Sequence, residues 1–381
     1  MKILMTTWEF PPMKVGGIAS HCYDLSRELM KEGHDVHVLT FGPEEKDEIV
    51  DGVYVHRIPS GHAPDTISWA NFLGHRMEKK AIELNKEEKF EVVHAHDWMM
   101  VPAGVAIKKT LRLPLVFTLH STEYGRVGIH TRYSKMINDL EWYGTYEANE
   151  VITVGKDFYN EVRSLFKVPE EKIHYIPNGV DIERFDIKPT VSKDEFAAGW
   201  EKMILFVGRL TYQKGLEFLI SSMPQILRDH PESKFVIVGR GEVERYKHMA
   251  ESLGIGEKTY FTGFLPEETV ISLFKLADAV AIPSVYEPFG IVALEAAAAS
   301  SPAVGSYVGG LKETIIHEKT GLHTIPKNNN SIKDQLDRVL SDPGWGKWLG
   351  RNGRKNAEKN YKWSKISKWT TGVYGKAMGL W

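Results

Sequence analysis

The stretch AVAIPSVYEPFGIVALEA, residues 279–296, contains the structural unit from which the fold of the whole chain can be predicted. Its first eight residues form an apolar run that is typical of a fully buried strand. A Pro-Phe-Gly turn follows, and the remaining residues have the composition of a helix. A buried strand that leads directly into a helix is the repeating unit of a parallel sheet covered on both faces.

The same alternation runs through the first half of the chain. Apolar runs predict strands at KILMTT, HDVHVLT, VYVHRI, EVVHAH, LPLVFTLH, EVITVG and IHYIPN. Amphipathic patterns predict helices between them, including helices at residues 17–33, 66–84 and 132–146. This order of elements indicates a parallel sheet with helices on both sides.

The pattern restarts after residues 178–196, a turn-rich segment that is the best linker candidate in the chain. The second half repeats the strand-then-helix order at MILFVGRL, KFVIVGRG, YFTGF and AVAIPS. We therefore predict an α/β fold with two doubly wound, Rossmann-like domains that face a deep cleft. In such sheets, ligands bind beyond the carboxyl ends of the strands.

Composition narrows the class of protein. The chain has 381 residues, of which 42% are apolar and 26% charged, and its net charge is −2. This balance is that of a water-soluble globular protein, and it gives no reason to expect nucleic acid or an acidic membrane as a partner. The single cysteine, Cys22, and the absence of a signal-peptide pattern favour a cytoplasmic location. Nothing in the sequence predicts the oligomeric state.

The first strand-to-helix turn is KVGG, residues 14–17. Gly16 and Gly17 let the backbone approach a ligand, and the helix behind them begins with unpaired N–H groups. Lys14 adds a cation beside them, although a Gly-Gly pair before a helix is by itself most often a plain tight turn. The GxGxxG pattern is missing and no acid follows the second strand, so we do not expect a dinucleotide site of the usual kind.

The second turn is GRLTYQKG, residues 208–215. Arg209 and Lys214 stand at its two ends, where they could direct positive charge to one place. Arginine offers a planar fork for two phosphate oxygens, and lysine supplies a compact charge. Each residue alone would be an ordinary surface cation, but a pair around a helix start favours an anion site.

The opening stretch adds two acids to this picture. If Pro288 takes the first helical position, Glu287 lies just outside the helix and Glu295 lies about two turns inside it, roughly 10 Å along the axis. Backbone N–H groups of Phe289, Gly290 and Ile291 would then be available at the positive end of the helix. An anion fits between the acids, and the carboxylates can accept hydrogen bonds from hydroxyl groups. A nucleotide sugar has hydroxyls, diphosphate and ribose in that order.

Histidines end two strands of the first half. VVHAHDWM, residues 92–99, contains His94, His96 and Asp97, and the next strand ends with His120. The first three could share a metal ion, but no fourth ligand can be named, and no Asp-x-Asp pair is available for a magnesium-bound diphosphate. We expect neither metal nor cofactor. His120 could bond a sugar hydroxyl, although a lone histidine at such a position is more often structural.

Together these motifs resemble those of a known family. KVGG, HAHDW, a strand ending in histidine, NGVD, GRLxxxKG and EPFGIVALE occur in the order found in GT-B glycosyltransferases of the retaining, group 1 and glycogen (starch) synthase-like type. EPFGIVALE is similar to the Glu-x7-Glu motif of that superfamily. The resemblance covers essentially the whole chain. It implies an acceptor-side domain at residues 1–180, a donor-binding domain at 181–362, and a last helix, 363–381, that packs back on the first domain.

The resemblance also implies roles for single residues. In the first domain, Lys14, Gly16 and Gly17 would line the donor phosphate and the acceptor edge, and Asp97 and His120 would hold the transferred glucose. In the second domain, Arg209 and Lys214 would stabilise the departing nucleoside diphosphate. The remaining donor contacts implied there are Glu287 to glucose hydroxyls, backbone contacts from Phe289, Gly290 and Ile291, and Glu295 to ribose.

The activity implied is retaining, metal-independent transfer of a hexose, with glucose as the first choice, from ADP- or UDP-glucose to an acceptor hydroxyl. A growing α-1,4-glucan, as in glycogen synthesis, is the first choice of acceptor. The compact first domain and the sequence TEYGR depart from the synthases, and AAAASSPAVGSYVGG departs from the group 1 relatives, so the acceptor stays open. A lipid or small-molecule acceptor, a nucleotide-sugar epimerase and a non-catalytic sugar sensor remain as alternatives.

Overall fold

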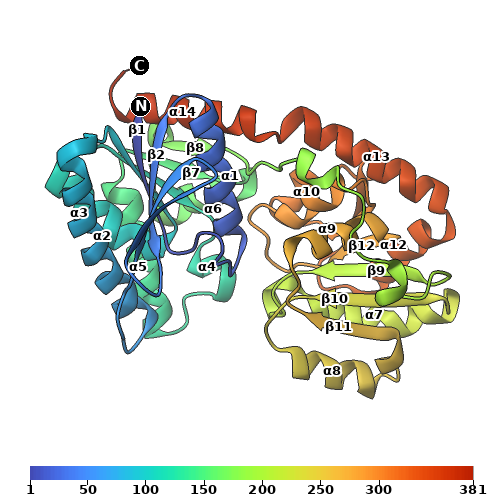
Figure 1. The fold of residues 1–381 in the computed structure, drawn as a ribbon. Coiled ribbons are helices and arrows are strands. Elements are labelled where there is room, and N and C mark those ends of the chain that lie inside the picture. Colours follow the sequence, from blue (N-terminus) through green and yellow to red (C-terminus); the bar gives the residue numbers. More distant parts are fainter. Residues whose placement is uncertain (381) are drawn as a thin grey trace. The chain divides into compact units, whose positions relative to one another are not determined.

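The computed structural model describes residues 1–380, which divide into two compact units (Figure 1). Unit 1 contains residues 1–179 and the segment from Trp363 onward, and unit 2 contains Val180–Lys362. The chain therefore passes from one unit to the other twice. Each unit is built on its own sheet with helices on both faces, so the predicted α/β fold of two Rossmann-like halves is confirmed.

Unit 1 has an eight-stranded sheet in the order β3-β4-β2-β1-β5-β6-β7-β8. All neighbouring strands run parallel except β3 and β4. The strands are β1 (Lys2–Thr7), β2 (Asp35–Phe41), β3 (Lys46–Val50), β4 (Val53–Ile58), β5 (Val92–His96), β6 (Leu115–Leu119), β7 (Glu150–Thr153) and β8 (Ile173–Tyr175).

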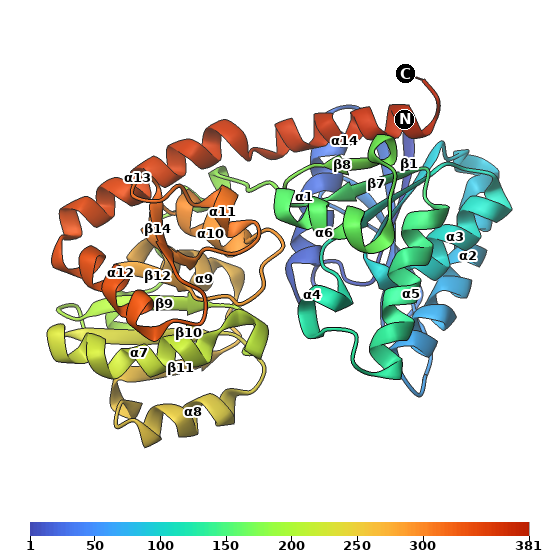
Figure 2. The same ribbon diagram turned by 180° about the vertical axis from the view of Figure 1, so that it is seen from behind.

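Helices cover both faces of this sheet. They are α1 (Gly17–Lys31), α2 (Thr66–Glu88), α3 (Val101–Leu111), α4 (Glu123–Val127), α5 (Arg132–Glu147), α6 (Lys156–Phe166) and α14 (Trp363–Ala377), with short 3-10 turns at η1 (Trp98–Met100) and η2 (Glu170–Lys172). Figures 1 and 2 show α2, α3 and α5 on one face and α1 on the other. Helix α14 packs against α1 and against strands β6 and β7.

The core of unit 1 follows from the sequence pattern. Strand β1 is buried on both sides, as expected for a central parallel strand, and its residues Ile3, Leu4 and Met5 are inaccessible to solvent. Helix α1 directs Cys22, Leu25 and Leu29 toward the sheet, at the spacing of one helix face. Ile366, Val373 and Tyr374 of α14 join the same cluster, so the last helix forms part of this core.

One strand of unit 1 was missed by the sequence analysis. Strand β3, KDEIV, is too charged to read as a buried strand, and it forms an antiparallel edge hairpin with β4. Its acids pair across the hairpin: Arg57 Nε donates to Glu48 Oε1 at 2.6 Å, and His56 Nδ1 lies 2.7 Å from Asp47 Oδ1. Charged side chains are a common protection for a sheet edge.

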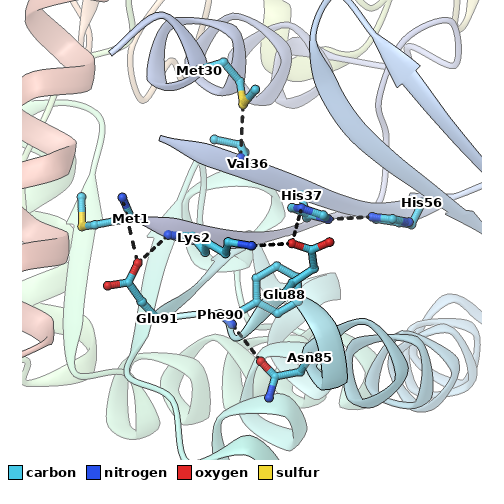
Figure 3. Close-up of polar contacts among 10 residues, drawn as sticks. All are labelled: Met1, Lys2, Met30, Val36, His37, His56, Asn85, Glu88, Phe90 and Glu91. Carbon is cyan, nitrogen blue, oxygen red and sulfur yellow. Dashed lines mark hydrogen bonds and ion pairs between the residues drawn. The ribbon is translucent and has the colours of Figure 1, made fainter. Parts of the chain in front are cut away.

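Polar contacts fix the starts of β1 and β2 to the end of helix α2 (Figure 3). Lys2 Nζ donates to Glu88 Oε2 at 2.7 Å, and the Lys2 backbone N–H donates to Glu91 Oε2 at 2.6 Å. His37 lies 3.7 Å from Glu88 and 3.0 Å from His56, and burial, followed by the nearby charge of His56, lowers the pKa of His37 to about 4. The neutral ring joins the two strands without adding buried charge.

Unit 2 has a six-stranded parallel sheet in the order β11-β10-β9-β12-β13-β14. Its strands are β9 (Lys202–Val207), β10 (Ser233–Val238), β11 (Thr259–Gly263), β12 (Ala279–Ile282), β13 (Ala303–Ser306) and β14 (Gly321–Thr324). Its helices are α7 (Leu216–Asp229), α8 (Val243–Ser252), α9 (Glu267–Leu276), α10 (Ile291–Ala298), α11 (Leu311–Thr314), α12 (Asn329–Ser341) and α13 (Pro343–Asn360). Short 3-10 turns occur at η3 (Glu183–Phe185), η4 (Lys193–Glu195), η5 (Tyr212–Lys214) and η6 (Gly256–Lys258).

The turn-rich segment 178–196 is ordered within these units. Asn178 bonds His21 of unit 1, and from Val180 onward the segment packs on unit 2, where Phe185 is buried and Lys193 Nζ lies 2.8 Å from Asp278 Oδ2. Among residues 1–380, no helix combines the length and the apolar character needed to cross a membrane.

Candidate active site

Three adjacent strands of unit 1 end in the motifs singled out from the sequence. Strands β1, β5 and β6 are neighbours and run parallel, so their carboxyl ends lie at one edge of the sheet. Glu9, Asp97 and His120 follow these three ends. This is the edge at which open α/β sheets bind their ligands.

Glu9 was missed by the sequence analysis and organises the KVGG turn. The side chain is buried, and its carboxylate accepts hydrogen bonds from the backbone N–H groups of Val15 at 2.5 Å, Gly16 at 2.9 Å and Ala19 at 3.3 Å. Helix α1 thus begins over a carboxylate of the chain itself, at the place where a phosphate would otherwise bind. In the sequence, the only indication of this role of Glu9 was the position of an acid between the first strand and a Gly-Gly turn.

The rest of the KVGG turn is open to solvent. Gly16 and Gly17 are exposed, and helix α1 begins at Gly17 with Gly16 as its N-cap. The ammonium of Lys14 lies 6.0 Å from the centre of the Tyr23 ring. The turn therefore keeps an exposed backbone edge even though Glu9 uses the N–H groups behind it.

Asp97 has an unusual backbone conformation for a residue other than glycine. Its φ is +64°, and its N–H donates to Thr118 O at 2.8 Å across to strand β6. Its carboxylate accepts from the N–H of Trp98 at 3.1 Å, at the start of η1. Residues held in this sparsely populated region cluster at functional sites. The strand ends fix Asp97, which is buried, in one orientation.

Three histidines meet beside Asp97. His96 Nδ1 lies 3.2 Å from His120 Nε2, and the His21 ring, on α1, is centred 4.7 Å from the ring of His120. His21 Nδ1 lies 2.8 Å from Asn178 Oδ1. Burial lowers the pKa of His21 to about 4, and burial together with the neighbouring rings holds the pKa values of His96 and His120 well below the ordinary value. All three rings are neutral at pH 7.

The histidines that could hold a metal ion differ from those considered in the sequence. His94 uses both ring nitrogens, on Tyr374 and Thr118, at 2.7 Å each, so it is not available as a ligand. Nitrogens of His21, His96 and His120 lie within 4.8 Å of one another, and neutral imidazoles are the form that binds metals. No carboxylate belongs to this group within residues 1–380. The absence of a metal stays a prediction.

A second set of charged groups lies close enough to Asp97 to interact with it electrostatically. Glu123 and Arg126 of α4 form an ion pair, and the Glu123 N–H donates to Glu141 Oε1 of α5 at 2.8 Å. Burial, with the nearby charge of Asp97, raises the pKa of Glu141 to about 9. Burial alone would lower the pKa of Arg126, but Asp97 and Glu123 raise it. The set therefore carries a protonated carboxyl at neutral pH, which no sequence pattern indicated.

We expect the substitution Glu141→Gln to remove a loss of folding stability that the wild type shows as the pH rises toward 9. The pKa of Glu141 rises from 4.5 to about 9 in the folded protein, so its contribution to stability is full below pH 4.5 and is lost as the pH rises toward 9. The slope is at most about 1.4 kcal/mol per pH unit. Urea unfolding at pH 7, 8 and 9 should show this loss for the wild type and a flatter profile for the variant. Parallel profiles would assign the decline to another group.

In unit 2, the two separate motifs meet through Lys214 and Glu287. Lys214 Nζ lies 2.7 Å from Glu287 Oε2, and Ser284 Oγ donates to the same oxygen at 3.1 Å. The two charged side chains are 18% and 10% exposed. Gly215, with φ +68°, makes this possible because a Cβ there would lie 1.9 Å from Pro283 O. The turn that carries Lys214 thus packs directly on the segment that follows β12.

The start of helix α10 corrects one sequence prediction. The helix begins at Ile291 and not at Pro288, because Gly290 adopts φ +94° as its N-cap. Glu295 is therefore the fifth residue of the helix, about 6 Å along the axis from Ile291 and just over one turn inside, not two. The first-turn N–H groups at this end belong to residues from Ile291 onward. Phe289 is buried in the turn before the helix.

A second pair of glycines, also missed, holds the Glu287 turn in place. The loop after β13 brings Gly309 and Gly310 against residues 287–289, and the Gly310 N–H donates to Glu287 O at 2.9 Å. A Cβ at Gly309 would lie 2.0 Å from Glu287 O, and one at Gly310 would lie 2.3 Å from Phe289 Cα. Only glycine allows this approach of two backbones.

Arg209 supplies an exposed cation at the same sheet edge. It follows β9, which is the neighbour of β12 in the sheet, and its side chain is exposed. Unit 2 thus combines an exposed guanidinium, a lysine–glutamate pair, a serine hydroxyl and the start of a helix. Such a set can bind an anion on one side and hydroxyl groups on the other.

The fold and this set of groups define a two-domain glycosyltransferase fold of the GT-B type. Solved structures of similar fold include sucrose-phosphate synthase from Thermosynechococcus elongatus, with a TM-score of 0.85, 23% identity and full coverage of both chains. They also include HepE of Anabaena in complex with UDP-glucose, with a TM-score of 0.81, 20% identity, and 99% and 100% of the two chains covered.

The sequence comparisons identify the family. The profile described as glycosyl transferases group 1 matches residues 188–360, and that of glycosyltransferase family 4 matches residues 15–184. An uncharacterized glycosyltransferase of Methanocaldococcus jannaschii is 45% identical over 100% of this chain and 99% of its own length. Glycogen synthase of Mycobacterium tuberculosis is 32% identical over 98% and 94%. The chain belongs to the group 1 glycosyltransferases.

Proposed function

We propose that the chain transfers glucose from ADP- or UDP-glucose to a hydroxyl group of a glycosyl acceptor, with an α-1,4-glucan as the first acceptor to test. The observation that carries this proposal is the Lys214–Glu287–Ser284 contact at the edge where Arg209 and the start of α10 also lie. The similarity to a glycogen synthase supports it, as does the similar fold of a protein solved with UDP-glucose.

The donor's diphosphate is proposed to bind between cations and backbone N–H groups. The Lys214 ammonium has three N–H donors and uses one on Glu287, which leaves others for phosphate oxygens. Arg209 and the first turn of α10 add charge and donors. Glu287 would accept hydrogen bonds from sugar hydroxyls, and Glu295, the fifth residue of α10, would bind the ribose.

The proposed reaction depends on charge separation. As the bond between the anomeric carbon and the diphosphate lengthens, positive charge builds on the sugar ring and negative charge on the leaving group. Preorganised cations stabilise this state more than the ground state and so lower the barrier. The leaving diphosphate would take the proton of the acceptor hydroxyl. Retention of configuration, independence of metal and a cytoplasmic location are parts of this proposal.

Asp97 and His120 are the groups of unit 1 proposed to hold the transferred sugar. Asp97 is fixed by its backbone, and His120 is a neutral ring that can donate or accept one hydrogen bond. A neutral ring adds no positive charge beside a sugar that itself becomes positive. This suits a group whose task is to orient hydroxyls.

A donor screen tests the proposal. The purified chain would be incubated with ADP-, UDP- and GDP-glucose, each with and without maltoheptaose, and the release of nucleoside diphosphate and the glucan length would be measured. We expect ADP- or UDP-glucose to extend the glucan, and the new bond to be cleaved by an α-glucosidase. No consumption of any donor would contradict the proposal. An epimerised sugar nucleotide formed without acceptor would favour the epimerase.

A further inference from the structure

Unit 1 contains a cavity of about 500 Å³ beside the KVGG turn. This volume lies within the range of small-molecule sites, roughly 300–1,000 Å³. The lining residues come from the ends of β1 and β2, from η1 and from the start of α2. They are Trp8, Glu9, Met13, Val15, Phe41, Ala63, Asp65, Thr66, Trp69 and Met99. The cavity therefore opens at the carboxyl edge of the sheet, where Glu9 and Asp97 lie.

The walls of the cavity are mainly aromatic and apolar. Trp8 and Trp69 contribute two half-buried indole rings. The Phe41 ring packs edge-on against the Trp69 ring, with 5.3 Å between the ring centres. Met13 and Met99 complete the apolar surface. Aromatic rings at a wet edge suit ligands that have an apolar face and a polar rim.

The polar groups of the cavity do not suit an anion. The ten lining residues include two acids and neither lysine nor arginine. Glu9 accepts the N–H groups of the KVGG turn, so those donors already face a carboxylate. Asp65 caps α2 by accepting from Ser68 N at 2.9 Å and Ser68 Oγ at 3.0 Å, and these bonds lower the pKa of Asp65. A phosphate group here would meet negative charge and few donors.

We propose that this cavity binds an uncharged pyranose ring of the acceptor, whose C–H face packs on Trp8 and Trp69, and that it rejects sugar phosphates. This inference rests on the proposed function, because it names the class of acceptor for the same reaction. Ring faces of a neutral sugar chain match the apolar walls, and its hydroxyls can reach Thr66 and solvent at the exposed rim. The charge of the lining supplies the selection against phosphate.

The test uses calorimetric titration of maltotriose and of maltose 1-phosphate into the full-length chain, with no donor present. This measurement needs no turnover, so its result is independent of the proposed transferase activity. We expect maltotriose to bind and the phosphate to bind at least tenfold more weakly. Equal or tighter binding of maltose 1-phosphate would overturn the inference.

Two variants locate the binding. Trp69→Ala removes one wall, and Ala63→Trp fills the cavity without removing any packing, so the second covers the case in which the first does not fold. Each should weaken maltotriose binding at least tenfold. Trp348→Ala, at an exposed position of α13 in unit 2, is the matched control and should bind as the wild type does. Wild-type binding by both cavity variants would overturn the proposal.

A third ligand tests whether the cavity binds an apolar aglycone and not a sugar ring. Octyl glucoside carries one sugar ring and an alkyl chain, and it would be titrated below its micelle concentration. The proposal predicts that it binds no more tightly than maltotriose. Tighter binding that is lost in Ala63→Trp would show that the cavity takes an apolar aglycone and would overturn the assignment to a sugar ring.

Discussion

Replacing Lys214 with alanine is expected to lower kcat by about a hundredfold or more, because one preorganised donor to a developing oxyanion typically contributes this much. The lysine is held 2.7 Å from Glu287 and lies largely out of solvent, so its charge has a fixed position. The variant should remain folded. Initial rates of nucleoside diphosphate release at saturating acceptor, together with circular dichroism, measure both effects.

Matched variants show whether the loss is due to the charge in this position. Glu287→Gln keeps the shape of its side chain but weakens the contact with Lys214, and it should also reduce transfer strongly. Lys347→Ala removes an exposed lysine of α13 and should leave the rate unchanged. Wild-type turnover in Lys214→Ala would rule out the role assigned to this residue.

Replacing Gly309 with alanine is expected to destabilise unit 2 and to abolish transfer. The new Cβ would lie 2.0 Å from Glu287 O, and the residue has φ +44°, so either the loop or the Glu287 turn must move. A cost of at least about 2 kcal/mol is expected from the steric overlap and backbone strain. Urea unfolding and the transfer assay would be run on the same preparation.

Gly372→Ala provides the control for this substitution. Gly372 lies in helix α14, and a Cβ there has no atom within 4 Å. Alanine in a helix interior should raise the stability of the protein by up to about 1 kcal/mol. If Gly309→Ala unfolded at the wild-type urea concentration and kept its activity, the contact between the two loops would not be needed for the site.

The sequence predicted the strands well because most of them lie inside a parallel sheet and read as continuous apolar runs. Strand β1 is an example, with Ile3, Leu4 and Met5 all buried. The motifs could be placed at one edge of each sheet for the same topological reason. Strand β3 was missed because it is a charged edge strand, stabilised by pairs such as Arg57 with Glu48.

The sequence singled out residues of the candidate site only where a local motif, such as a strand-to-helix turn, carries them. Lys214 and Glu287 were each singled out, but their contact depends on Gly215 lying against Pro283, which no spacing in the sequence indicates. Glu9 and Glu141 act through contacts with other segments, so each looked like an ordinary acid.

The predicted start of α10, Pro288, was wrong by three residues, because the helix begins at Ile291. Proline is favoured at the first helical position, but the turn is set by Gly290 and by the loop of Gly309 and Gly310. A local preference was therefore overridden by contacts that the sequence alone does not show.

The measurement that tests the central claim most directly is a crystal structure of the chain with ADP or UDP bound. We predict that the diphosphate lies within hydrogen-bonding distance, about 3 Å, of Lys214 Nζ and of the first-turn N–H groups of α10, with the ribose at Glu295. A nucleotide bound away from Lys214 and α10 would contradict the assignment of the donor site.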